Sequence, residues 1–423
     1  MAAPAACRAA PSPCAAGGRP VTGTATTGRL DLSAPPHSPV RAWIAERLFR
    51  LAVTRLPVRV VLPGGEVLGR GGPDAPMMAV ERPAFFDRVG ARGMIGFGEA
   101  YTAGDWTSAD PAATLTPFAE RLATLVPAPL QRLRRLVDAR RPAAERNTPD
   151  GARSNIHRHY DLSNGLFAAF LDESMSYSSA WFEPGDDLYR AQLRKIDGVL
   201  DYAGVGPGSR VLEIGTGWGA LAVRAARRGA TVTSLTISTE QRDLAVERIA
   251  AAGVADRVEV ALRDYREASG SYDAVVSVEM VEAVGEDYWP EYFATVDRVL
   301  APGGRVALQA ITMPHDRLVA SRHTNGWINE YVFPGGQLLS VPAIEEQVRA
   351  NTGLAITARR RLGEHYARTL RLWRERFLAA GDHVASLGFD DTFRRLWEFY
   401  LAYCEAGFRA HYLDVWQFRL ARA

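Results

Sequence analysis

Two glutamates near the middle of the chain have the spacing of a cooperating acid and base. Glu279 and Glu282 lie three residues apart in Ser277-Val-Glu-Met-Val-Glu-Ala-Val-Gly285. On a helix this spacing would place both side chains on one face. Crowded carboxylates raise one another's pKa, which suits proton abstraction near neutral pH. Glu279 is therefore a candidate base in addition to Glu282, and a capping or ion-pairing role is an equal alternative for Glu279.

A glycine-rich turn precedes these glutamates in the sequence. In Val211-Leu-Glu-Ile-Gly-Thr-Gly-Trp-Gly219, Gly215, Gly217 and Gly219 follow a predicted strand that contains Glu213. Glycine lets a backbone turn sharply and approach a ligand at the carboxyl end of a sheet. The order differs from the G-x-G-x-x-G of dinucleotide-binding proteins and resembles the first motif of class I methyltransferases. A structural or nicotinamide-binding turn is the alternative.

The resemblance to class I methyltransferases implies S-adenosylmethionine as the cofactor. It assigns Glu213 and the glycines to the amino-acid part of that molecule. Asp264 and Tyr265 follow the predicted third strand, where this class usually places an acid for the adenine amino group and an aromatic residue beside the ring.

Strands and helices alternate from about residue 185 onward. The predicted strands are 210–214, 231–236, 258–262, 272–277 and 304–310, with helices after Gly219 and from Thr239. This alternation is typical of a parallel sheet with helices on both faces. We therefore expect an α/β fold, with a Rossmann-like class I methyltransferase sheet in a catalytic domain over residues 142–423.

The N-terminal third of the chain has a different character. Residues 1–40 are mostly Ala, Pro, Gly and Thr, which predicts a disordered tail. Residues 41–141 predict a smaller mixed α/β domain, beginning with a helix that contains Trp43, Ile44, Leu48 and Phe49. In its last part, 130–141, leucines at helical spacing accompany arginines. Such a basic helix suits an anionic bilayer surface, and a helix packed on its own protein is an equal alternative.

Composition limits the classes of partner. Fifty basic and 48 acidic residues give a net charge of +2, which provides no case for a nucleic-acid partner. Lys195 is the only lysine, which we attribute to codon usage.

The cysteines and histidines lack disulfide or metal-site spacing, so we expect no metal. No apolar run approaches the roughly 18 residues of a spanning helix. We expect a cytoplasmic protein, peripheral at the inner membrane surface.

Several separate motifs resemble the cyclopropane fatty acid synthase family, which includes the mycolic acid cyclopropane synthases. They lie at 159–164 (HYDLSN), 177–182 (YSSAWF), 235–241 (LTISTEQ), 277–285 (SVEMVEAVG), 333–336 (FPGG), 365–370 (HYARTL) and 404–409 (CEAGFR). The segment 96–106 further resembles the lipid-binding N-terminal domain of the longer bacterial synthases. The resemblance thus covers all of the chain except the tail.

This resemblance implies methyl transfer from S-adenosylmethionine to the cis double bond of an unsaturated phospholipid acyl chain in a membrane. The product would be a cyclopropane or a methylene-branched (10-methylene type) acyl lipid. Methyl addition leaves a carbocation, so the site needs electron-rich aromatic walls and a base. The motifs assign further cofactor contacts to Tyr177, Ser178, Thr236, Ile237 and Gln241, and the family suggests a homodimer.

In this family a bound bicarbonate ion, held by a Cys, a Glu, a His and a Tyr, is thought to act as the base. The Glu and Tyr correspond to Glu282 and Tyr366. Ser179 and Gln309 stand where the family has the Cys and the His, and Ala283 replaces a further histidine. Ser179 and Gln309 can donate hydrogen bonds to an oxyanion, so a bicarbonate site is expected in altered form. These departures favour the methylene-forming branch.

Two other residues complete the candidates. His159, in the His-Tyr-Asp motif, is expected to cover the cofactor and border the anion site. Cys404 aligns with a cysteine once proposed as the family's nucleophile, whereas a lone cysteine among aromatic residues is more often a small buried hydrophobe. Two alternative functions remain: a small-molecule C-methyltransferase on the same scaffold, and a catalytically impaired lipid-binding pseudoenzyme that has lost the Cys and the His.

Overall fold

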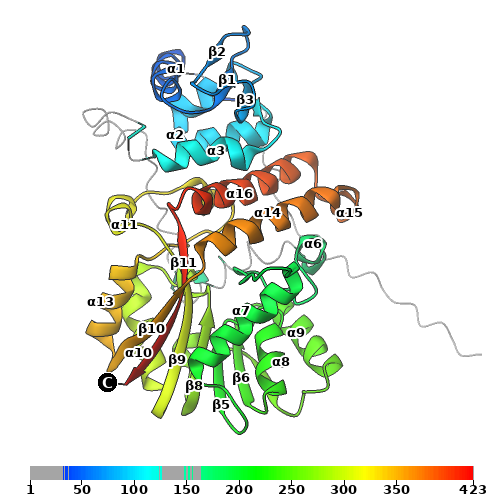
Figure 1. Ribbon diagram of the computed structural model, residues 1–423, viewed down its shortest axis with the longest axis vertical. Helices are drawn as coiled ribbons and strands as arrows, with labels where there is room; N and C mark the ends of the chain where they lie inside the picture. Colours follow the sequence, from blue (N-terminus) through cyan, green and yellow to red (C-terminus); the bar gives the residue numbers. More distant parts are fainter. Residues whose placement is uncertain are drawn as a thin grey trace, which may run out of the picture.

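The computed structural model contains two β-sheets separated by a layer of helices (Figure 1). It describes residues 32, 34–36, 38–122, 124–125, 147–148, 151–152, 155 and 163–422. Most of the predicted tail, the predicted basic helix at 130–141 and His159 lie outside the described residues. None of the helices that the structure describes is long and apolar enough to cross a membrane.

The smaller sheet belongs to the N-terminal region and has the strand order β2-β1-β3-β4. Its elements are α1 (Pro39–Val53), β1 (Arg59–Val61), β2 (Val67–Leu68), β3 (Met77–Val80), α2 (Ala84–Ala103), β4 (Trp106–Thr107) and α3 (Pro111–Glu120). The predicted first helix is present, but it buries Ala45, Phe49 and Val53 at a spacing of four residues. Trp43 and Ile44, expected in the same apolar pattern, are exposed on its other side.

The larger sheet has seven strands in the order β10-β11-β9-β8-β5-β6-β7. They are β5 (Arg210–Ile214), β6 (Thr231–Thr236), β7 (Val258–Leu262), β8 (Tyr272–Val278), β9 (Leu300–Thr312), β10 (Leu354–Arg361) and β11 (Asp414–Arg422). The first five pair in parallel, as predicted. The sheet also contains two strands that were not predicted, and it is mixed because β11 runs antiparallel to both β9 and β10. An antiparallel edge on a parallel sheet is common in α/β folds.

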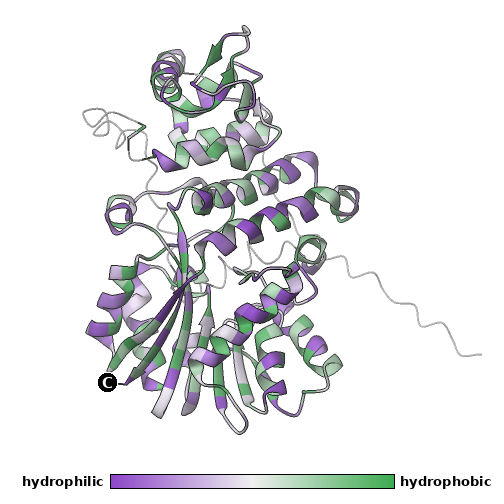
Figure 2. Cartoon of the chain, viewed as in Figure 1, coloured by the Kyte–Doolittle hydropathy of each residue, from purple (hydrophilic) through white to green (hydrophobic). Residues whose placement is uncertain are grey.

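Helices cover both faces of this sheet and enclose two separate hydrophobic cores. On one face lie α7 (Leu188–Ala203), α8 (Ala220–Arg227) and α9 (Thr239–Ala251), and on the other α10 (Trp289–Arg298) and α13 (Val341–Asn351). Figure 2 shows hydrophobic residues along the central strands, consistent with the nearly continuous burial of β5 and β8. Buried parallel strands of this kind hold their loops rigidly at the carboxyl edge.

Shorter elements and the C-terminal helices complete the structure. The short elements are α6 (Asn164–Phe170), η3 (Tyr265–Glu267), η4 (Val281–Ala283), η5 (Glu286–Tyr288), α11 (His315–Ser321) and α12 (Trp327–Tyr331). The C-terminal helices are α14 (Gly363–Ala379), α15 (Gly381–Ser386) and α16 (Asp391–Arg409). Helices α14 and α16 lie between the two sheets (Figure 1).

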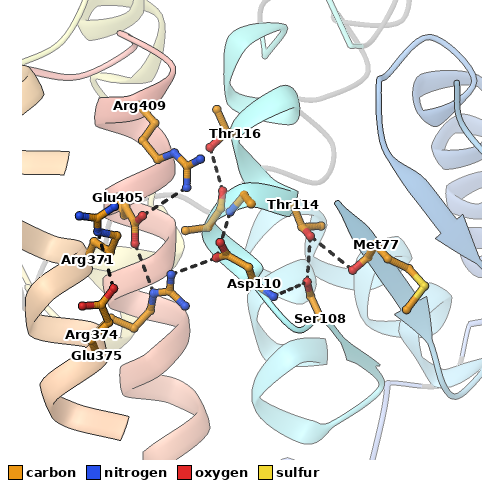
Figure 3. Close-up of polar contacts among 12 residues, drawn as sticks. Met77, Ser108, Asp110, Thr114, Thr116, Arg371, Arg374, Glu375, Glu405 and Arg409 are labelled. Carbon is orange, nitrogen blue, oxygen red and sulfur yellow. Dashed lines mark hydrogen bonds and ion pairs between the residues drawn. The ribbon is translucent and has the colours of Figure 1, made fainter. Parts of the chain in front are cut away.

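A buried ion-pair network joins these C-terminal helices to the N-terminal region (Figure 3). Arg374 of α14 donates to Glu405 of α16 at 3.2 Å and to Asp110, the N-cap of α3, at 2.9 Å. Arg409 also pairs with Glu405, at 3.3 Å. The Glu405 side chain is 1% exposed, so its charge depends on the two arginines. Beside the network, Phe399 of α16 packs against Trp106 and other aromatic rings of the N-terminal region.

We predict that Arg374→Leu destabilises the protein by about 2 kcal/mol, because the buried Glu405 carboxylate then keeps only its contact with Arg409, which is 39% exposed. The measurement is the midpoint of thermal unfolding. Arg349→Leu is the matched control, since Arg349 pairs with Glu346 on an exposed helix surface. Equal midpoints for the two variants would contradict the role assigned to the network.

Candidate active site

The predicted cofactor loop and the two glutamates meet at the carboxyl edge of the large sheet. Gly215, Gly217 and Gly219 follow β5 with φ values of 96°, 52° and 84°, a region that favours glycine. A Cβ placed on Gly215 would lie 3.1 Å from Cγ of Met280, which stands between Glu279 and Glu282 in the sequence. The loop after β5 therefore packs directly against the turn after β8. In open α/β sheets, ligands bind at this edge.

Glu213 is buried inside this edge at the end of β5. Its side chain accepts a hydrogen bond from the Ser234 hydroxyl of β6, and Ser234 also contacts the Thr216 hydroxyl at 2.7 Å. Burial raises the pKa of Glu213 to about 8, against the opposing effects of Ser234 and Lys195. A cationic ligand nearby would favour the ionised form. This electrostatic preference suits the ammonium or sulfonium groups of S-adenosylmethionine.

The other residues expected to contact the cofactor lie on neighbouring loops of the same edge. Thr236 ends β6, and its hydroxyl contacts Gln241 Oε1 at 3.2 Å in the first turn of α9, with Ile237 half-buried between them. Asp264 follows β7 and forms a 2.7 Å ion pair with Arg266. The Tyr265 ring contacts Tyr292 edge to face. Cofactor contacts from these residues stay predictions.

Glu279 is the first residue after β8, and its backbone has a left-handed φ of 50°. The expectation that Glu279 and Glu282 share a helix face is therefore wrong. Only Val281–Ala283 form a single 3-10 turn, and Glu279 lies in the sharp bend before it. A non-glycine residue in this region carries about 1 kcal/mol or more of strain, which the surroundings must offset.

Three hydrogen-bond donors from distant segments converge on the Glu279 carboxylate. The Ser179 backbone N–H donates to Oε1 at 2.9 Å, and Gln309 Nε2 donates to the same oxygen at 2.7 Å. The Tyr366 hydroxyl donates to Oε2 at 2.7 Å. The Ser179 hydroxyl instead donates to the Ala180 carbonyl, so Ser179 serves this site through its backbone. The donors that the resemblance assigned to an external anion thus hold a carboxylate of the chain itself.

Gln309 is held in its orientation by a second glutamine. Its Oε1 accepts from Gln417 Nε2 at 3.0 Å, and Gln417 Oε1 accepts from Arg360 at 3.1 Å. Both glutamines lie on the paired strands β9 and β11, directly opposite each other. This order of donors leaves the Gln309 amide N–H₂ group facing Glu279. An amide does not titrate, so the donation persists at every working pH.

Glu282 lies close to Glu279 and has fewer partners. Its Oε1 accepts from the Ile311 backbone N–H, whereas its Oε2 is buried and has no hydrogen-bond partner among the described residues. Burial, and next the charge of Glu279, raise the pKa of Glu282 to about 8. Burial also raises the pKa of Glu279, against the donors from Tyr366, Ser179 and Gln309. Their shared burial and mutual repulsion therefore disfavour ionisation of both carboxyls at once, and the three donors favour the ionised form of Glu279.

The site contains a cation, Lys195, that was not among the predicted site residues. Lys195 of α7 is 2% exposed and donates to the Ser178 hydroxyl at 2.6 Å. Burial lowers its pKa to about 8, and Glu279, Asp172 and Glu213 oppose the shift. The signal was present: it is the single lysine among 50 basic residues. Its compact ammonium and depressed pKa distinguish it from the arginines, whose guanidinium stays charged.

Electron-rich aromatic rings surround the carboxylates. The Tyr177 hydroxyl contacts the Tyr400 hydroxyl at 2.6 Å, and the Tyr177 ring lies 5.3 Å from Trp373. The Tyr366 ring contacts Trp373 and Phe408, with centroids 6.1 and 4.6 Å apart. Faces of tyrosine and tryptophan stabilise a cation that has little access to water. The site can therefore accommodate a carbocation beside a base.

Cys404 lies on α16 among these aromatic residues. Burial raises the pKa of its thiol to about 12, so the thiolate is negligible at neutral pH. This finding favours the alternative of a small buried hydrophobe over the nucleophile. His159 lies outside the described residues, and its role stays a prediction.

The pKa of Glu282 leads to a prediction about stability. Its ordinary pKa is 4.5 and its folded pKa is about 8. As the pH rises through this interval the unfolded chain loses the proton first, so folding stability that is present below pH 4.5 is lost toward pH 8. Between pH 5 and pH 8 the wild type should lose about 3 kcal/mol of stability that Glu282→Gln keeps, at about 1.4 kcal/mol per pKa unit.

Thermal unfolding midpoints across this pH range provide the measurement. Glu346→Gln is the control, because Glu346 is exposed and should follow the wild-type pH dependence. Parallel curves for Glu282→Gln and the wild type would show that Glu282 does not take up a proton on folding in this range.

Comparison with known proteins identifies close relatives. The sequence profile described as Mycolic acid cyclopropane synthetase matches residues 147–418. The tuberculostearic acid methyltransferase of Mycobacterium tuberculosis is 52% identical over 92% of this chain and 93% of its own length. The cyclopropane-fatty-acyl-phospholipid synthase of Escherichia coli is 35% identical over 81% of this chain and 87% of its own.

The fold has a counterpart among solved structures. A mycolic acid cyclopropane synthase crystallised with S-adenosylhomocysteine and cetyltrimethylammonium bromide (CTAB) is 32% identical, with a TM-score of 0.59. The match covers 63% of this chain and 97% of that protein.

Proposed function

Because the chain belongs to the mycolic acid cyclopropane synthetase family, we propose that it methylates the cis double bond of an unsaturated phospholipid acyl chain. The chain is an S-adenosylmethionine-dependent methyltransferase. The observation that carries the proposal is the direct packing of Gly215 against Met280, which brings the predicted methyl-donor loop next to the two carboxyls. This packing supports a methyl donor and a base that lie side by side at the carboxyl edge of the sheet.

The chemistry explains why these components must be adjacent. An unactivated alkene attacks the sulfonium methyl only when water is excluded and the reacting carbons are held close together. S-adenosylmethionine supplies the methyl group when bound. Tyr177, Trp373 and Tyr366 provide aromatic faces for the carbocation that follows. A carboxylate of the Glu279–Glu282 pair then removes one proton, and its site of removal decides the product.

We propose a methylene-branched acyl chain as the product, rather than a cyclopropane. The relative that is 52% identical is named for tuberculostearic acid, a 10-methyl acid, whereas the cyclopropane-forming relatives are 33–35% identical. The replacement of the family's Cys and His by Ser179 and Gln309 supports the same branch. A homodimer stays a prediction from the family resemblance.

Incubation with methyl-labelled S-adenosylmethionine and vesicles of oleoyl phospholipid tests the function. We expect label in the acyl chain, as a methylene branch that catalytic hydrogenation converts to a methyl branch. Mass spectrometry of the released fatty acids provides the measurement. Absence of label from every unsaturated lipid would refute the function, and a ring product would refute only the assigned branch.

The outer side of α1 is our candidate for membrane contact. Four apolar side chains there are 42–70% exposed: Val40, Trp43, Ile44 and Leu51. Exposed arginines at 41, 47 and 55 flank them, and Arg47 lies over the Trp43 ring. A helix with exposed apolar and basic residues is suited to the interface of an anionic bilayer. In this proposal the N-terminal region docks on the surface of the bilayer through α1.

Trp43→Ala should weaken binding to anionic phospholipid vesicles about tenfold, since burying a large apolar side chain contributes on the order of 2 kcal/mol. Co-sedimentation with vesicles measures the effect. Tyr189→Ala is the control, because Tyr189 is an aromatic residue on α7, 40% exposed, outside the N-terminal region. Wild-type binding by Trp43→Ala would remove α1 from the docking surface.

A further inference from the structure

We propose that the Glu279 carboxylate is the built-in base of this enzyme and takes the place of a bound bicarbonate ion. The inference rests on the proposed methyl transfer to an alkene and specifies how the resulting cation loses its proton. Its premise is the convergence of Ser179, Gln309 and Tyr366 on one carboxylate of the chain itself.

The backbone at Glu279 is shaped to deliver this carboxylate. A left-handed φ of 50° directs the side chain from the end of β8 into the pocket. The conformation is costly for a residue with a Cβ. Three hydrogen bonds to the carboxylate offset that cost, and a hydrogen bond from the Glu279 backbone N–H to the Gln309 carbonyl at 2.8 Å fixes the turn. The strained backbone at Glu279 is therefore retained because it positions the carboxylate that is to act as the base.

An additional anion does not fit this set of residues. The donors that would bind bicarbonate already hold Glu279, and a second carboxyl, Glu282, shares the pocket. The charge of Lys195 acts on Glu279, and Asp172 and Glu213 compete for that charge. An added anion would be desolvated here without donors or charge to stabilise it.

The hydrogen bonds distinguish the two carboxyls. Glu282 Oε2 has no partner among the described residues, so it can carry the proton that the pair shares. Glu279 accepts from three donors and is the better-stabilised anion. A carboxylate offers about four acceptor positions, so one remains on Glu279 Oε2 to accept a proton from the substrate.

The proton transfer balances without any further reactant. Methyl transfer makes one C–C bond, breaks the sulfonium S–C bond and leaves a carbocation with a neutral thioether. Glu279 Oε2 then forms an O–H bond as a substrate C–H bond breaks. A 1,2-hydride shift first moves the cation to the carbon that bears the new methyl group, and the C–H bond that breaks belongs to this methyl group. The electron pair of that C–H bond becomes the π bond of the methylene branch, and Glu279 later releases the proton to water. Bicarbonate appears nowhere in this sequence.

The first test compares methyl transfer in bicarbonate-free buffer, prepared under argon, with transfer after bicarbonate is added. We expect the wild-type rate to change less than twofold. A rate that falls tenfold or more on removing bicarbonate would overturn the inference while leaving the proposed function intact. If the wild type labels no lipid in either buffer, the proposed function fails and this inference with it.

The second test uses two variants of one position. Glu279→Gln keeps the side-chain volume but not the base, and should lower turnover at least 100-fold, with neither bicarbonate nor formate restoring it. Glu279→Gly relieves the left-handed strain and frees the three donors. We expect it to be equally slow in bicarbonate-free buffer and to recover at least tenfold when bicarbonate or formate is added.

Controls separate a chemical role from a structural one. Both variants should bind S-adenosylmethionine by calorimetry with wild-type affinity, and Glu346→Gln should match the wild-type rate. A purely structural role would not respond to an added anion. Wild-type activity in Glu279→Gln, or a folded Glu279→Gly that binds cofactor and is not rescued, would contradict the assignment.

Discussion

The hydrogen bonds to the Glu279 carboxylate tie together segments that are far apart in the sequence. Ser179 lies before the large sheet, Gln309 in its longest strand, and Tyr366 on a helix between the two sheets. A buried carboxylate without donors would be strongly unfavourable, so these segments must be assembled together around it. The same bonds hold Glu279 in a backbone conformation that is otherwise strained. The geometry of the site therefore depends on this one charge.

The shortage of positive charge inside the site is the second constraint. Glu213 and Glu282 have pKa values raised by burial, and Lys195 is a buried cation whose own pKa is lowered. A positively charged ligand would compensate for this shortage, because it stabilises the ionised form of the buried carboxyls. The sulfonium of S-adenosylmethionine and the carbocation that follows methyl transfer are both such species. The electrostatics of the site therefore favour the positively charged reacting species, as catalysis requires.

The central strands of the large sheet were predictable from the sequence, whereas the sharp backbone bend at Glu279 was not. Strands β5, β6 and β7 have the predicted bounds, because short segments rich in Val, Leu and Thr alternate along the chain with helical segments. The arginine-rich β10 and the alternating β11 were not predicted, and with them the antiparallel part of the sheet. A three-residue spacing suggested a helix for Glu279 and Glu282, since a left-handed residue other than glycine has no local sequence signal. Lys195 was overlooked because only the fold shows that this rare lysine is buried.

A crystal structure of the enzyme with S-adenosylhomocysteine, grown at high bicarbonate concentration, tests the central claim most directly. We expect the Glu279 carboxylate to keep its contacts with the Ser179 N–H, Gln309 Nε2 and the Tyr366 hydroxyl, without a separate anion among these donors. A bicarbonate ion bound to the three donors, with the Glu279 side chain displaced from them, would contradict the account.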